Sequence, residues 1–269
     1  MITIPLVMAV EEDVTNLGFW GPVTATIDWC EENYVWTEYI AEFFNTISNS
    51  ALVILGIYGI YQNFRQRHDN SLLAAWLSMI AVGVGSAAFH CTLRYVEQQC
   101  DETPMVWGQL AWNFLLYKEK FSHPKAWRHF VAVLFIIYAA VFAYLHAIFR
   151  FTTAFQWHFV FISAFSVRKL VQVYQKMKQP EGRRILKENM AALVIAVTFW
   201  LADHLLCDHM QSLPVNPQGH AVWHILMGYY CYTGPIFIQY YQALETNRKP
   251  HIRRVMFVIP IVEVRSKLD

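Results

Sequence analysis

Two histidines four residues apart, His220 and His224, open the last long apolar stretch of the chain. On a helix this spacing puts both imidazoles on one face, where they can share a metal ion. His90, at the end of another apolar stretch, is a third candidate ligand. Three histidines are a known ligand set of catalytic zinc, whose fourth position is left to water. Packed or interfacial histidines are the alternative interpretation.

Ser86 lies four residues before His90 and therefore shares its helix face. This position makes it a candidate residue of the same site. The alternative is a small residue that lets two helices pack closely, because Gly83 and Gly85 stand beside it.

Asp101 precedes another apolar stretch, in the sequence Cys-Asp-Glu-Thr-Pro at 100–104. Proline is favoured at the first helical position and threonine at the N-cap, so Pro104 and Thr103 are predicted to begin a helix. Asp101 is then free of a capping role. Ionisable residues at membrane depth are costly and mark functional sites, so we expect Asp101 to join the histidines.

The first 42 residues contain eight Asp and Glu and no Lys or Arg. Carboxylates gathered with an Asn amide are the oxygen ligands that calcium prefers. The spacing is not that of an EF-hand. A solvated acidic segment is the alternative.

A second polar cluster, residues 203–209, lies near the end of the sixth apolar stretch. Asp203 is a candidate partner that orients a ligand histidine through its other ring nitrogen. We interpret His204, Asp208 and His209 as solvated residues at the membrane interface.

The elements that position these residues must be membrane helices. Of the 269 residues, 56% are apolar and 15% charged, against about 45–50% and about 25% in soluble domains. The net charge of +1 gives no reason to expect a nucleic-acid partner. Seven stretches approach the roughly 20 residues that a spanning helix needs, which predicts an all-α membrane protein with a seven-transmembrane helix bundle. They are residues 41–61, 71–90, 103–117, 129–148, 151–174, 189–206 and 220–241.

Positive charge orients this bundle. Of the 21 Lys and Arg, all but Arg94 and Arg150 fall on one side of the predicted membrane, and that side is cytosolic. The N terminus is thus predicted to be lumenal or extracellular, and His90, Asp101 and His220 share the lumenal level. We expect an acidic segment at 1–42, a catalytic bundle at 43–241 and a cytosolic tail at 242–269. The opening apolar stretch is short and lacks a basic leader, so no signal peptide is predicted.

Several motifs together resemble the alkaline ceramidases, which belong to the CREST superfamily of seven-span membrane hydrolases and receptors. The resemblance covers the chain from Trp20 to about residue 245. It is carried by Trp20-Gly-Pro, Asp28-Trp-Cys-Glu-Glu-Asn33-Tyr, Ala41-Glu42-Phe43 with Asn45 and Ser48-Asn49, Gly85-Ser86 with Phe89-His90, Asp101-Glu-x-Pro104-Met105 and His220-Ala-x-Trp-His224-Ile-Leu.

The resemblance implies a set of site residues. The zinc ligands would be His90, His220 and His224, with Ser86 and Asp101 completing the catalytic site. The calcium site would use the side chains of Asp28, Glu31, Asn33 and Glu42 and the carbonyl of Trp29. A lumenal disulfide would join Cys30 to Cys207, and Cys91, Cys100 and Cys231 would stay unpaired.

The implied activity is hydrolysis of the N-acyl amide of ceramide into a sphingoid base and a fatty acid, in the endoplasmic reticulum or Golgi membrane. Asp101 would act as general base and then acid, and Ser86 would donate a hydrogen bond to the developing oxyanion. The partners would be the ceramide substrate and membrane lipids. A lipid-binding receptor of the same superfamily, with little ceramide turnover, is the alternative; the segment from Asp28 to Glu42 favours the ceramidase branch.

Overall fold

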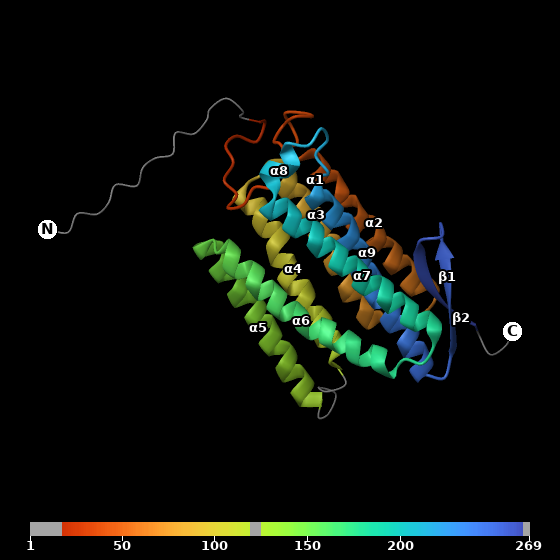
Figure 1. Ribbon diagram of the computed structural model, residues 1–269. Coiled ribbons are helices and arrows are strands. Elements are labelled where there is room, and N and C mark those ends of the chain that lie inside the picture. Colours follow the sequence, from red (N-terminus) through yellow and green to blue (C-terminus); the bar gives the residue numbers. More distant parts are fainter. Residues whose placement is uncertain (1–17, 119–124, 266–269) are drawn as a thin grey trace.

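Helices dominate the computed structural model, which describes residues 18–118 and 125–265. The helices form one bundle, with a short β hairpin at the end of the described chain (Figure 1). The opening apolar stretch lies outside the described residues. The elements are α1 (Phe43–Ser48), α2 (Ser50–Arg65), α3 (Leu73–Thr92), α4 (Tyr95–Leu116), α5 (Lys125–Phe149), α6 (Thr152–Lys176), α7 (Pro180–Leu205), α8 (Cys207–Gln211), α9 (Gly219–Glu245), β1 (Lys249–Val255) and β2 (Ile259–Arg265).

Each predicted apolar stretch falls on a helix, with α1 and α2 sharing the first. Within the described residues, four helical segments are long and apolar enough to cross a membrane: Phe43–Arg65, Asn70–Thr92, Ala126–Phe149 and Pro180–Leu205. The fold class of an all-α membrane protein is therefore confirmed.

The helix α4 begins earlier than the sequence predicts. It starts at Tyr95, so Pro104 lies inside the helix and Thr103 is not its N-cap. Because proline has no N–H, the carbonyl of Cys100 loses its helical hydrogen bond. Gly85 of α3 approaches that peptide: a Cβ placed on it would lie 2.5 Å from the carbonyl carbon of Cys100. The lack of a side chain at Gly85 thus lets α3 and α4 pack closely.

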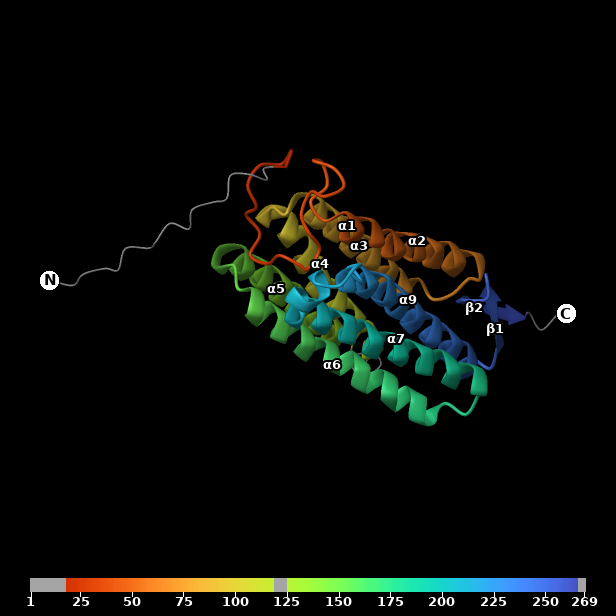
Figure 2. The same cartoon turned by 45° about the horizontal axis from the view of Figure 1, so that its top comes forward.

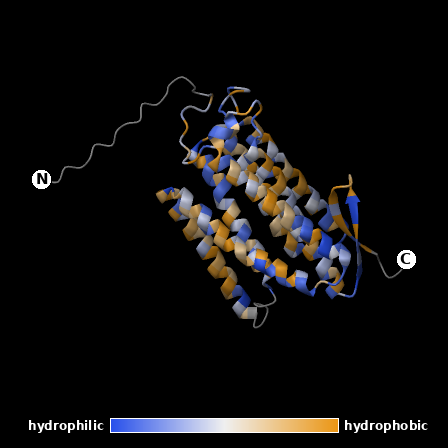
Figure 3. Ribbon diagram, in the orientation of Figure 1, coloured by the Kyte–Doolittle hydropathy of each residue, from blue (hydrophilic) through white to orange (hydrophobic). Residues whose placement is uncertain are grey.

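The centre of the bundle is formed by α2, α3, α7 and α9, and α5 and α6 lie together against α4 (Figure 1). Trp76, Tyr232 and Phe237 are fully buried in this core. Large apolar side chains also cover the outside, such as Ile136 and Phe149 of α5, each 68% exposed (Figure 3). Apolar residues on both the inside and the outside are what a lipid solvent requires.

The C-terminal stretch contains an antiparallel β hairpin that the sequence analysis did not anticipate. It packs at the end of α9 (Figure 2), and His251 and Arg254 of β1 pair with Glu181 and Glu188 of α7. Ile261 and Val262 of β2 are buried, and the Tyr232 hydroxyl of α9 donates to the carbonyl of Pro260 at 2.9 Å.

The segment before α1 is held at the opposite end of the bundle. The backbone N–H groups of Ala41 and Glu42 donate to the carbonyls of Cys91 and His90, both at 2.9 Å. The last turn of α3 therefore carries this segment beside the histidines.

Candidate metal and catalytic site

Three histidines meet where α3 ends and α9 begins. His90 of α3 and His220 and His224 of α9 are all buried, and one potential ligand atom from each lies within 4.8 Å of the others. Among the His, Cys, Asp and Glu side chains of the described residues, these three histidines lie close enough together to hold a metal ion. The two helices thus confirm the predicted meeting of these residues.

The ring nitrogens leave room for a metal. Nε2 of His90 and Nδ1 of His220 are buried without a hydrogen-bond partner, a costly state for a polar atom. The Ser48 hydroxyl donates to the carbonyl of Asn45 at 3.0 Å and lies 2.8 Å from Nδ1 of His224. The Asn49 amide nitrogen lies 3.3 Å from the same Nδ1, so the polar contacts of His224 fall on Nδ1, and its Nε2 makes no hydrogen bond within the described residues. Such a set of nitrogen donors fits zinc.

Each histidine of the cluster has a supporting partner from the segment before α2. Nδ1 of His90 is hydrogen-bonded to the buried carboxylate of Glu42, and Ser48 holds His224. Partners of this kind fix the tautomer and the ring orientation of metal ligands. The sequence analysis assigned Glu42 to calcium alone and gave Ser48 no role. The signal was present as polar residues within the first apolar stretch.

Trp29 supports the third histidine by stacking on its ring. The ring centroids of Trp29 and His220 lie 3.6 Å apart with planes inclined by 18°. The backbone N–H of Trp29 donates to Glu42 at 3.2 Å. One short segment therefore contacts both His220 and the partner of His90.

Asp203 differs from its expected role. Its carboxylate accepts the backbone N–H of His220 at 3.0 Å and that of Cys30 at 3.1 Å, so it caps the start of α9 instead of orienting an imidazole. The implied disulfide between Cys30 and Cys207 is present, with 5.2 Å between the Cα atoms. His204 and His209 are exposed and lie outside the histidine cluster.

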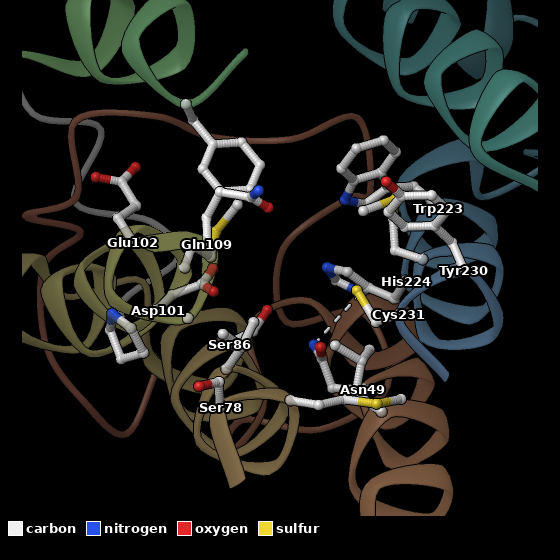
Figure 4. Close-up of a pocket in the computed structure, with 18 of the residues that line it drawn as sticks. Asn49, Ser78, Ser86, Asp101, Glu102, Gln109, Trp223, His224, Tyr230 and Cys231 are labelled. Atoms are coloured by element: carbon white, nitrogen blue, oxygen red, sulfur yellow. Dashed lines mark hydrogen bonds between the residues drawn. The ribbon is translucent and has the colours of Figure 1, made fainter. Parts of the chain in front are cut away.

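Ser86 and Asp101 face His224 across a cavity of about 280 Å³ (Figure 4), which His220 also lines. Ser86 is buried on α3, and its side chain lies beside that of Asp101 on α4 in the wall of this cavity (Figure 4). The close packing at Gly85, one residue away, brings the two side chains together. Most of the cavity wall is apolar, and it includes Met79, Phe155 and Leu170. Two of the three histidines therefore line the same largely apolar cavity as Ser86 and Asp101.

The acidic segment divides into two parts. The carboxylate of Glu31 accepts the backbone N–H groups of Phe44 at 2.7 Å and Asn45 at 2.8 Å. Burial raises the pKa of Glu31, and these two donors oppose that rise. Glu31 thus satisfies donors at the start of α1 that would otherwise lack a partner.

The other part brings Asp28 toward Glu42. Asp28 accepts a hydrogen bond from Nδ2 of Asn33 at 3.1 Å, and Oδ1 of Asn33 is buried without a partner. Partial burial, followed by the negative charge of Glu42, raises the pKa of Asp28 to about 7. Two acids and an unsatisfied amide oxygen are compatible with a hard cation.

Fold and site together define a membrane protein with a buried three-histidine cluster, two members of which line an apolar cavity. The chain belongs to the ceramidase family, whose sequence model matches residues 21–263. It is 34% identical to an alkaline ceramidase of Arabidopsis thaliana over 93% of this chain and 96% of that protein. It is 29% identical to alkaline ceramidase 3 of Mus musculus, over 93% of this chain and 96% of that protein. It is 30% identical to alkaline ceramidase YPC1 of Saccharomyces cerevisiae, over 86% of this chain and 80% of that protein. The resemblance predicted from the motifs is confirmed.

Proposed function

We propose that the chain is a zinc-dependent amide hydrolase that cleaves ceramide into a sphingoid base and a free fatty acid. Family membership supports ceramide as the substrate. The observation that carries the mechanism is a cluster of three buried histidines, two of which line an apolar cavity together with Ser86 and Asp101.

The ligands of the zinc would be His90, His220 and His224. Zinc bound there would polarise the amide carbonyl and lower the pKa of water from about 15.7 to about 7. The partnerless nitrogens of His90 and His220 support this assignment, as do the polar contacts of His224, which fall on Nδ1.

Asp101 and Ser86 would handle the proton and the oxyanion. Asp101 removes a proton from the attacking water and returns it to the leaving amine when the C–N bond breaks, as general base and then acid. Ser86 donates its hydrogen bond to the oxygen that becomes negative in the transition state. The acyl carbon gains the hydroxyl group, and the nitrogen leaves as the amine of the sphingoid base.

The apolar part of the cavity suits the alkyl chains of the substrate. Its wall contains Met79, Phe155 and Leu170, which offer no hydrogen bonds to a lipid chain. Ceramide would enter from the bilayer and place its amide beside the histidines.

We assign a calcium ion to the acidic segment, held by side chains of Asp28, Glu31, Asn33 and Glu42 and by the carbonyl of Trp29. A cation there would relieve the repulsion between Asp28 and Glu42 and satisfy the buried oxygen of Asn33. Because the ring of Trp29 stacks on His220, ordering this segment would also order the histidines.

For the topology we propose seven membrane spans, formed by α2 with α1, α3, α4, α5, α6, α7 and α9. The N terminus would be lumenal and the C terminus cytosolic, in the endoplasmic reticulum or Golgi membrane. The distribution of Lys and Arg supports this orientation. A disulfide at the histidine end of the bundle agrees with an oxidising compartment on that side.

The test is turnover together with metal content. The protein in lipid nanodiscs is incubated with ceramide, and sphingoid base and fatty acid are quantified by mass spectrometry while zinc is measured by elemental analysis. We expect equal amounts of both products and near-stoichiometric zinc. His224→Ala should lose most of its turnover and most of its zinc. His209→Ala, which changes an exposed histidine at the same end of the bundle, should keep its turnover and its zinc. Unchanged zinc in His224→Ala would refute the site.

A further inference from the structure

The turn between β1 and β2 exposes three apolar side chains, which we call the hairpin tip. Met256 is 81% exposed, Phe257 94% and Val258 57%. Met256 and Phe257 have φ angles of 50° and 63°, a left-handed conformation that is uncommon for bulky residues and that hairpin turns usually fill with Asn and Gly. The tip is thus neither covered by the described chain nor built from ordinary turn residues.

The rest of the hairpin is firmly docked. The guanidinium of Arg254 donates to both carboxylate oxygens of Glu188 on α7 at 2.8 Å. Tyr232 of α9 holds the carbonyl of Pro260, and Ile261 is fully buried. The hairpin tip therefore projects from a fixed position.

Contacts with α7 show in which direction the hairpin runs. His251 near its base pairs with Glu181, the second residue of α7. Arg254, nearer the tip, pairs with Glu188, which lies about 12 Å along the helix from Pro180 at a rise of about 1.5 Å per residue. The hairpin therefore extends alongside the bundle (Figure 1).

The contacts with α9 give the same direction. Tyr240 lies beside Gly182 near the start of α7, since a Cβ on that glycine would be 3.0 Å from its ring. Tyr232, which holds Pro260, is eight residues or about 12 Å closer to the histidines. The hairpin tip immediately precedes Ile259 and Pro260 in the chain, so it lies near the level of Tyr232. At that level runs the membrane-facing part of α7, one of the four segments able to span a bilayer.

Apolar side chains face outward on the helices that run from this end of the bundle. Phe64 of α2 is 57% exposed and Val194 of α7 is 65% exposed, and lipid is the solvent that such helices require. We propose that the hairpin tip inserts into the acyl-chain region of the membrane leaflet at the bundle end opposite the histidines. The pair of Arg254 and Glu188 lies at the boundary with the headgroups, and Met256, Phe257 and Val258 reach past it into the lipid.

The test compares the reactivity of two cysteines. Phe257→Cys and, as the matched control on the exposed base of the same hairpin, Lys249→Cys are placed in nanodiscs that hold one chain each. A charged, membrane-impermeant maleimide is added, and peptide mass spectrometry separates each new cysteine from Cys91, Cys100 and Cys231. We expect the cysteine at 257 to react at least about tenfold more slowly than the one at 249, and the two rates to converge after denaturation in SDS.

Rates within about twofold of each other in the folded protein would overturn the proposal, because the tip would then be in water. Slow labelling at 257 in cell membranes together with fast labelling in nanodiscs would also overturn it, since another protein would then be covering the tip. If Phe257→Cys does not yield a monodisperse protein, Val258→Cys is measured instead, with the same expected result.

Discussion

Gly85→Ala tests whether the close approach of α3 and α4 builds the catalytic site. The new Cβ would lie 2.5 Å from the carbonyl carbon of Cys100 and 3.1 Å from the amide nitrogen of Asp101, whereas ordinary contact begins at 3.4 Å. Both atoms belong to backbone, so no side chain can rotate away. The carbonyl oxygen of Cys100 would lie nearer still, so the two helices must separate by more than about 1 Å at this level.

This separation acts directly on the site, because Ser86 and His90 lie on α3 and Asp101 on α4. A misplacement of about 1 Å can cost about 10²-fold in rate, and overpacking a core costs about 1–3 kcal/mol. We expect kcat for ceramide to fall by about 10²-fold and the melting temperature to fall by a few degrees. Turnover and thermal unfolding are measured in nanodiscs.

Gly234→Ala is the matched control on α9. A Cβ there would meet the ring of Trp112 at 3.5 Å, an ordinary contact, and alanine favours a helix more than glycine does. Because Gly234 also lines the cavity, this control is judged by stability, which we expect to be equal or higher. Parental kcat and an unchanged melting temperature in Gly85→Ala would refute the reasoning about helix separation.

Three further predictions concern individual residues and calcium. Asp101→Asn should reduce turnover by at least about 10²-fold with unchanged zinc content; loss of zinc would make Asp101 structural. Glu42→Gln keeps the shape of the partner of His90 but removes its charge, so zinc affinity in a chelator competition titration should fall by about 10–100-fold; equal affinity would contradict the supporting role. A chelator selective for calcium over zinc should lower turnover and the melting temperature without removing zinc. If turnover and melting temperature both stay unchanged, the acidic segment is a solvated segment without a calcium site.

Several features of this protein follow from sequence alone. The apolar stretches are long enough to require helices whatever their neighbours are, because a backbone in lipid must satisfy its own hydrogen bonds. The spacing of His220 and His224 is a local property of one helix. The motifs from Trp20 onward predicted the family that the comparisons confirm.

Other features needed the tertiary structure. A threonine followed by proline locally favours a helix start, but α4 continues back to Tyr95, and Gly85 of another helix packs against its peptide at Cys100. The hairpin likewise exists through its contacts with α7 and α9, since a two-stranded hairpin is marginal by itself.

The supports of the histidines show the same division between local and distant information. The residue types at Glu42 and Ser48 are visible in the sequence, but their partners His90 and His224 lie 48 and 176 residues away. Spacing rules describe neighbours within one helix or strand, and they do not state which distant segments meet. Only packing of the bundle brought the acidic segment onto the three histidines.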